Sequence, residues 1–265
     1  LTHRQRSNAS CNPENRPREG RGVVKHSLTP AGALAYQDDR VIVVVTGLRR
    51  PSANIKTGDL VQSWVLSRHE APHDAVRSGG DAIVCGDCPQ RPSTGGACYV
   101  RVEQAPLSVW HAYQRGGYPV LTSEMLAWAR ARGAALRIGS YGDPSAVPAL
   151  LWERLTAEFR RSVGYTHAWR TSPDLRSVAM ASVESEEGAR EARAAGWRYF
   201  RMRSAGSPLL DGEIECPASE GGGYLRTCAT CGACDGARSA KDRRASVSIV
   251  AHGARVRRML PVMTK

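Results

Sequence analysis

The sequence predicts an α/β protein whose parallel strands form a sheet or a partial or full TIM-like barrel, with a cysteine-rich, metal-binding C-terminal segment. The prediction rests on a β-branched run, a regular alternation of strand and helix patterns after residue 100, and cysteines gathered in two groups. With 265 residues, 42% of them apolar, the chain can bury a large core. We expect a flexible basic arm over 1–35, the α/β body over 36–205 and the cysteine-rich segment over 206–265.

The body begins with "RVIVVVTGL", 40–48, a continuous β-branched run that predicts a buried strand. An apolar stretch after Gly58 follows it. Thr122 or Ser123 is expected to cap one helix and Ser185 another, because their side-chain oxygens can accept from the first free backbone N–H groups. The remaining pattern predicts helices at 108–116, 122–133, 147–164 and 185–196, a strand that runs into a loop at 134–144, and strands at 165–172, 177–185, 197–206 and 245–253.

The charge balance favours a polyanionic partner. The formal net charge is +12, which favours a nucleic acid or a nucleotide. The alternative is coding bias, since nearly all the basic residues are Arg and only four are Lys. No apolar run reaches membrane-spanning length and no secretory leader is visible, so we expect no membrane association and a cytoplasmic, reducing location. In that compartment clustered cysteines indicate metal more than disulfides.

The second cysteine group gives the stronger metal signal. Cys228, Cys231 and Cys234 follow C-x2-C-x2-C, and Cys216 precedes them by eleven intervening residues. This run is the core of bacterial-type ferredoxin ligation, in which thiolates hold a [4Fe–4S] cluster. The alternative is a structural zinc site with four cysteines, although zinc commonly uses paired C-x2-C units.

The first group, Cys85, Cys88 and Cys98, follows C-x2-C-x9-C in a Gly- and Pro-rich stretch. Three thiolates on a [4Fe–4S] cluster leave one iron free, and that iron can bind the amino and carboxylate groups of S-adenosylmethionine (SAM). A fourth ligand would instead close the site, and zinc with three cysteines and a histidine fits the same spacing. The candidates for a fourth ligand are His69, His73, Cys11 and Asp87.

The order of the motifs resembles a known family. "SANIKTG", a cysteine loop ending "CYV", "LRIGSYGDP", "YTHAWR" and a late cysteine cluster before a histidine resemble phage proteins known as gene product 88, over roughly residues 50–255. More distantly, the chain is similar to radical-SAM enzymes, in which the loop after the first barrel strand carries three cluster cysteines.

The resemblance implies that Tyr99 is the aromatic residue beside the last cluster cysteine and that the second cysteine group holds an auxiliary cluster. The usual radical-SAM triplet is C-x3-C-x2-C, and this chain departs from it. The resemblance therefore supports an iron–sulfur cluster on an α/β barrel more firmly than it supports SAM chemistry.

The stretch "GSYGDP", 139–144, is the expected cofactor edge, because parallel sheets bind ligands at the carboxyl ends of their strands. Ser140 and Gly142 lie in it, and Asp143 could accept from ribose hydroxyls. Asp143 is also the one candidate nucleophile for a transglycosylase-like barrel. The alternative is an ordinary turn in which Asp143–Pro144 opens the next helix.

Four further residues are candidate substrate contacts: His167, Glu184, Arg201 and His252. Each has a structural alternative, as a hydrogen-bonded or solvated residue. Arg198, Arg201 and Arg203 also form a possible phosphate-contacting strip. We therefore expect a radical-SAM-like enzyme with two [4Fe–4S] clusters that acts on a nucleic acid or a nucleotide. The alternative is a non-catalytic nucleic-acid-binding protein stabilised by iron–sulfur clusters or zinc.

Overall fold

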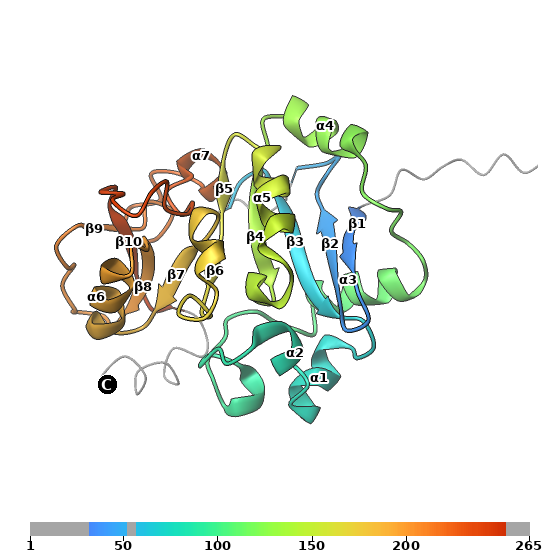
Figure 1. The fold of residues 1–265 in the computed structure, drawn as a ribbon, viewed down its shortest axis with the longest axis horizontal. Coiled ribbons are helices and arrows are strands. Elements are labelled where there is room, and N and C mark those ends of the chain that lie inside the picture. The colour runs from blue at the N-terminus through green and yellow to red at the C-terminus, as the bar shows by residue number, and fades with distance from the viewer. Residues whose placement is uncertain (1–31, 52–56, 253–265) are drawn as a thin grey trace, which may run out of the picture.

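The computed structural model describes residues 32–51 and 57–252, and parallel strands in chain order form its centre (Figure 1). These strands begin with β3 (Leu60–Ser67) and β4 (Ala135–Tyr141); β3, β4 and β5 pair in chain order in one sheet, and β6, β7 and β8 pair in chain order in a second sheet. The remaining parallel strands are β5 (Ser162–Val163), β6 (Tyr165–Thr166), β7 (Met180–Val183), β8 (Tyr199–Arg203), β10 (Ser246–Val250) and β9 (Glu213–Glu215).

Two five-stranded sheets meet at Gly164. β5 pairs with β4 in the first sheet, and β6 pairs with β7 in the second. The carbonyl of Gly164 accepts from Met180 N at 3.0 Å, so the hydrogen bonding continues through the junction. A Cβ at Gly164 would lie 2.9 Å from Ile138 Cβ, so the close approach of the two strands requires glycine.

The first sheet is completed by antiparallel strands. β1 (Gly32–Gln37) pairs with β2 (Val41–Thr46), and β2 pairs with β3. The buried strand predicted at 40–48 is confirmed, but its neighbours run antiparallel to it. Residues 32–35 belong to β1 rather than to an arm, and the rest of the predicted arm lies outside the described residues.

A closed barrel is not formed, so the full TIM-like barrel was wrong as a prediction. Within residues 32–51 and 57–252, β1 and β9 stand at opposite ends of the strand order and do not pair. The reason is that one edge continues as the antiparallel β1–β2 hairpin instead of further strand–helix units. The parallel α/β architecture itself is confirmed.

The helices agree with the sequence pattern where their caps were visible. Thr122 Oγ1 accepts from Met125 N and opens α4 (Ser123–Ala131), and Ser185 accepts from Gly188 N and opens α6 (Glu186–Ala194). α5 (Ala149–Ala157) is shorter than predicted, because β5 already begins at Ser162. The other helices are α1 (Pro72–Ser78), α2 (Ala82–Cys85), α3 (Ala105–Gln114) and α7 (Cys228–Cys231), and the 3-10 turns are η1 (Pro92–Thr94), η2 (Pro144–Ala146) and η3 (Pro173–Ser177).

The parallel sheet has two different faces. Leu136, Ile138 and Val183 pack with α5 and α6 residues such as Trp152 into the main core. Alternate residues of the same strands point to the opposite face, which we call the inner face. Its half-buried members are Gln62, Arg137, Tyr165, His167, Ser182, Glu184, Phe200 and Met202.

The cysteine-rich segment is part of the fold rather than a separate appendix. β10 lies between β8 and β9 in the second sheet, so residues after 205 complete the body. Among the described residues no helix is both long and apolar enough to cross a membrane.

Candidate metal and cofactor site

The two cysteine groups lie at opposite edges of the parallel sheet. α2, which ends at Cys85, lies at the carboxyl edge, and α7, which carries Cys228 and Cys231, lies at the amino edge (Figure 1). The first group follows β3 directly, because the chain passes from β3 through α1 into α2. Cys88 N donates to Cys85 O and Cys98 N donates to Gln90 O, which folds the loop back on itself.

None of the seven described cysteines forms a disulfide bond, so the disulfide alternative is not realised among them, and Cys11 lies outside the described residues. Burial raises the pKa of Cys85, and the nearby Cys88 and Cys98 raise it further. The three thiols are therefore close enough to influence one another. Thiols crowded in this way favour a bound cation, which stabilises their deprotonated form.

The second group shows the same mutual influence. Burial raises the pKa of Cys216, and Cys228 and Cys231 add to the shift. Burial also raises the pKa of Cys234, and the nearby Cys216, Cys228 and Cys231 raise it further. Cys234 accepts a hydrogen bond from the Tyr165 hydroxyl. The four thiols predicted to act together are thus neighbours in the structure.

The expected cofactor edge lies against the first group. Gly142 has φ +78°, and a Cβ there would lie 2.6 Å from Val65 O, so the turn needs glycine. Asp143 N donates to Val84 O at 2.6 Å, which ties the turn to α2. The turn that follows β4 and the cysteine loop therefore form one unit.

Asp143 is a structural residue. Its carboxylate accepts from Ser145 N, from Thr166 Oγ1 and from His167 N at 2.7–2.9 Å. It is buried, and these donors occupy both of its oxygens. The ribose contact and the nucleophile role predicted for Asp143 are therefore not supported, and the alternative, a turn that Asp143 opens, matches the structure.

His167 connects a cysteine with a carboxylate. Its Nδ1 lies 3.3 Å from Cys88 Sγ, and its Nε2 lies 2.8 Å from Glu184 Oε1. Burial alone would lower the pKa of His167, but these two contacts raise it well above its usual range. His167 and Glu184 follow β6 and β7 at the carboxyl edge, as the sequence predicted.

Several buried polar atoms near this site have no hydrogen-bond partner among the described residues, and they include Ser140 Oγ, Tyr141 Oη and Gln90 Nε2. Gln90 belongs to the cysteine loop, and the pKa of Tyr141 is raised by burial and then by Cys85. An unpartnered buried polar group costs about 1–3 kcal/mol, so a polar ligand here would satisfy donors that the protein leaves free. Ser140 was predicted from the sequence, whereas Tyr141 and Gln90 were not.

Arg137 lies on the inner face between the two groups. Its guanidinium donates a hydrogen bond to the Tyr99 hydroxyl at 2.6 Å. Tyr99, and after it Tyr165 and Cys228, raise the pKa of Arg137. No carboxylate of the described part of the chain pairs with it. The sequence signal that could have identified it is a single charge between Leu136 and Ile138 in an apolar strand. Tyr99 is 61% exposed beside Cys98.

The remaining predicted residues lie elsewhere. Arg201 is buried on the helix-covered face, where it forms a bidentate ion pair with Glu213 at 2.7 Å. Arg198 and Arg203 are paired with Asp235 and Glu215, so the phosphate-contacting strip was wrong as a prediction.

Three histidines were also predicted to be near a site. His252 is exposed just after β10, at the carboxyl edge, where Nδ1 lies 3.0 Å from Val250 O. His69 and His73, two of the candidates for a fourth ligand, contact Asp39 O and Asp74 instead.

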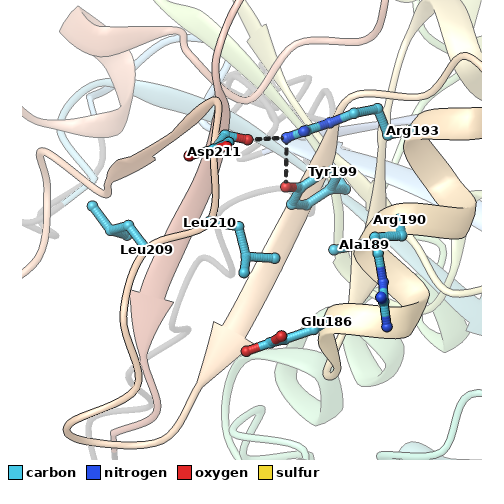
Figure 2. Close-up of a pocket in the computed structure, with 8 residues that line it drawn as sticks. All are labelled: Glu186, Ala189, Arg190, Arg193, Tyr199, Leu209, Leu210 and Asp211. Carbon is cyan, nitrogen blue, oxygen red and sulfur yellow. Dashed lines mark hydrogen bonds between the residues drawn. The ribbon is translucent and has the colours of Figure 1, made fainter.

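A surface pocket of about 420 Å3 lies away from both cysteine groups, between α6 and the segment after β8 (Figure 2). Arg193 crosses it and donates to the Tyr199 hydroxyl and to Asp211 O. None of the cysteines or predicted site residues lines this pocket, so we do not place the candidate site there.

Within residues 32–51 and 57–252, no three or more His, Cys, Asp or Glu side chains are arranged to hold a metal ion. The thiolates of a [4Fe–4S] cluster bind different iron atoms, so their sulfurs stand further apart than those around a single ion. Comparison of the chain with protein-family models, with curated proteins and with solved structures found no match.

Proposed function

We propose that the chain is a radical-SAM-like iron–sulfur enzyme that acts on a nucleic acid or a nucleotide. The observation that carries the proposal is the position of Cys85, Cys88 and Cys98. They follow β3, the first of the chain-ordered parallel strands, and the Gly142 turn at the end of the next strand binds their loop. Parallel α/β folds place cofactors at this edge.

The three thiols of the first group would hold a [4Fe–4S] cluster and leave one iron open to SAM. When bound and reduced, such a cluster supplies the electron that cleaves SAM to methionine and a 5′-deoxyadenosyl radical, which takes a hydrogen atom from the substrate. The free polar atoms of Ser140 and Tyr141 would bind polar groups of the ligand. The hydrogen bond that Glu184 accepts from His167 Nε2 fixes the orientation of the His167 ring beside Cys88.

Cys216, Cys228, Cys231 and Cys234 would hold a second cluster. The Arg137 guanidinium, which has no carboxylate partner in the described part of the chain, would offset the negative charge of these thiolates. Tyr165 would support the same cluster through its hydrogen bond to Cys234. Zinc is the alternative occupant of this four-thiol group.

The choice of nucleic acid or nucleotide rests on the net charge of +12. The same charge favours the second candidate function, a nucleic-acid-binding protein in which metal only holds the loops in place. In that case the polar side chains near Cys88, at the carboxyl edge of the sheet, would have no chemical role.

The test is anaerobic incubation of the iron-loaded protein with SAM and dithionite as the reductant, with 5′-deoxyadenosine and methionine measured by chromatography. We expect both products from the wild type and neither from Cys88→Ser. Salt-dependent nucleic-acid binding that is indifferent to SAM, with no 5′-deoxyadenosine formed, would refute the enzyme and support the second candidate.

A further inference from the structure

A polar cavity of about 400 Å3 lies at the amino edge of the sheet, apart from the proposed SAM site. One wall is the connection between α5 and β5, with Arg160, Arg161 and the first residue of β5, Ser162. The other wall runs from Cys231 and Gly232 to the segment that carries the side chains of Asp235, Arg238 and Arg244. Four arginines and a single carboxylate therefore share this cavity.

The carboxylates near the cavity are already used by other arginines. Both oxygens of Asp235 accept from Arg244 at 2.8 Å, and Oδ1 also accepts from Arg198 at 2.6 Å. Asp242 accepts from Arg244 as well, at 2.6 Å. Hydrogen bonds from Arg244 lower the pKa of Asp242, so this carboxylate stays ionised and paired.

Within the described ranges, three guanidinium groups of this cavity have no carboxylate close enough to neutralise their positive charge fully. Arg160 and Arg161 are exposed, and neither pairs with a carboxylate among the residues that the structure describes. Arg238 approaches Asp235 only to 3.9 Å, and its side chain is 76% exposed. The stem of Arg161 lies over Gly232, where a Cβ would meet it at 2.9 Å, so glycine there lets Arg161 cross the cavity.

We propose that this cavity binds a phosphate group of a nucleotide or of a nucleic-acid strand. A guanidinium group can donate two parallel hydrogen bonds to the oxygens of a phosphate. Several guanidinium groups around one cavity also repel each other, and a bound anion removes this repulsion. A volume of about 400 Å3 is within the range of small-ligand sites. The proposal depends on the proposed function only for the source of the phosphate, and it requires no metal.

The test measures binding of a fluorescent 12-nucleotide single strand and of inorganic pyrophosphate to the purified full chain, without SAM. The test variant is Arg160→Gln/Arg161→Gln, in which glutamine keeps part of the stem. The matched control is Arg115→Gln/Arg154→Gln, which removes the same charge from exposed positions outside the cavity. Circular dichroism checks that both variants are folded.

We expect the test variant to bind both probes about tenfold or more weakly per arginine lost, with a smaller salt dependence for the strand, while the control stays close to wild type. Strong competition by a nucleoside monophosphate assigns the site to a nucleotide, and weak competition assigns it to a strand. Equal losses in test and control variants, or pyrophosphate binding unchanged or absent in all proteins, would overturn the proposal. If the phosphate-binding proposal fails but 5′-deoxyadenosine is still formed, the proposal that the chain is an enzyme is unaffected.

Discussion

Glu184 holds the ring of His167 at the carboxyl edge of the sheet, with Oε1 2.8 Å from Nε2. The other ring nitrogen thereby faces Cys88 Sγ at 3.3 Å. These residues come from the ends of two neighbouring parallel strands and from the cysteine loop. The pair therefore connects the sheet to the proposed cluster loop.

The His167–Glu184 contact predicts energetic coupling. Glu184→Ala and His167→Ala should each lower the free energy of unfolding by about 1–3 kcal/mol, because each leaves a largely buried partner unsatisfied. The double variant should cost less than the sum, by about 0.5–3 kcal/mol. Urea unfolding of the four proteins in one metal state measures this, and additive losses would contradict the contact.

The packing of the Gly142 turn predicts that alanine at Gly142 destabilises the protein much more than alanine at Gly79. Gly142 and Gly79 have φ +78° and +84°, but a Cβ at Gly142 would overlap Val65 O whereas Gly79 has open space around it. Gly79→Ala should cost about 1–2 kcal/mol from backbone conformation alone. Gly142→Ala should cost clearly more and lower the melting temperature further. Equal shifts in thermal unfolding would show that the turn is not packed as described.

The Arg201–Glu213 pair predicts a change in acid stability. Burial would raise the pKa of Glu213, but hydrogen bonds from Arg201 and from Leu210 N hold it below the usual 4.5. A depressed folded-state pKa contributes stability above the unfolded pKa, and the contribution is lost as the pH falls through the folded value.

Glu213→Gln should therefore be destabilised by about 3–5 kcal/mol near neutral pH, with a smaller difference from wild type below pH 4. Urea unfolding between pH 3 and pH 7 checks this. The exposed pair Arg170–Glu191 supplies the control, because Glu191→Gln should cost much less. A Glu213→Gln penalty that does not change with pH would contradict the assigned charge state.

The separation of the two cysteine groups predicts that their metals are lost independently. Cys228→Ser/Cys231→Ser should remove the iron of the second site and leave the SAM-dependent spectral change of the first. Cys88→Ser should have the opposite effect. Iron analysis together with absorption spectra distinguishes the two, and loss of all iron in both variants would indicate a single shared site.

The sequence predicted the parallel α/β body well because strand–helix alternation and helix caps are local signals. Thr122 and Ser185 cap the helices that they were expected to cap. The antiparallel β1–β2 hairpin and the junction at Gly164 were missed, because strand direction and sheet joining depend on contacts between distant segments.

The sequence predicted several residues of the candidate site but not the contacts between them. His167 and Glu184 were placed near strand ends, yet the contact of His167 with Cys88 spans 79 residues and leaves no sequence pattern. Arg201 was assigned to substrate because alternation in a strand does not reveal which face is covered. The structure places it in a buried ion pair on the helix side.

The proposed function requires that both cysteine groups hold iron–sulfur clusters and that the first cluster has an open iron. The most direct measurement is anaerobic purification with iron, sulfide and zinc counted per chain, and with absorption spectra recorded before and after SAM is added. We expect about eight irons and as many sulfides per chain, with a spectrum that changes when SAM is added. Two zinc ions per chain and no visible absorption would contradict it.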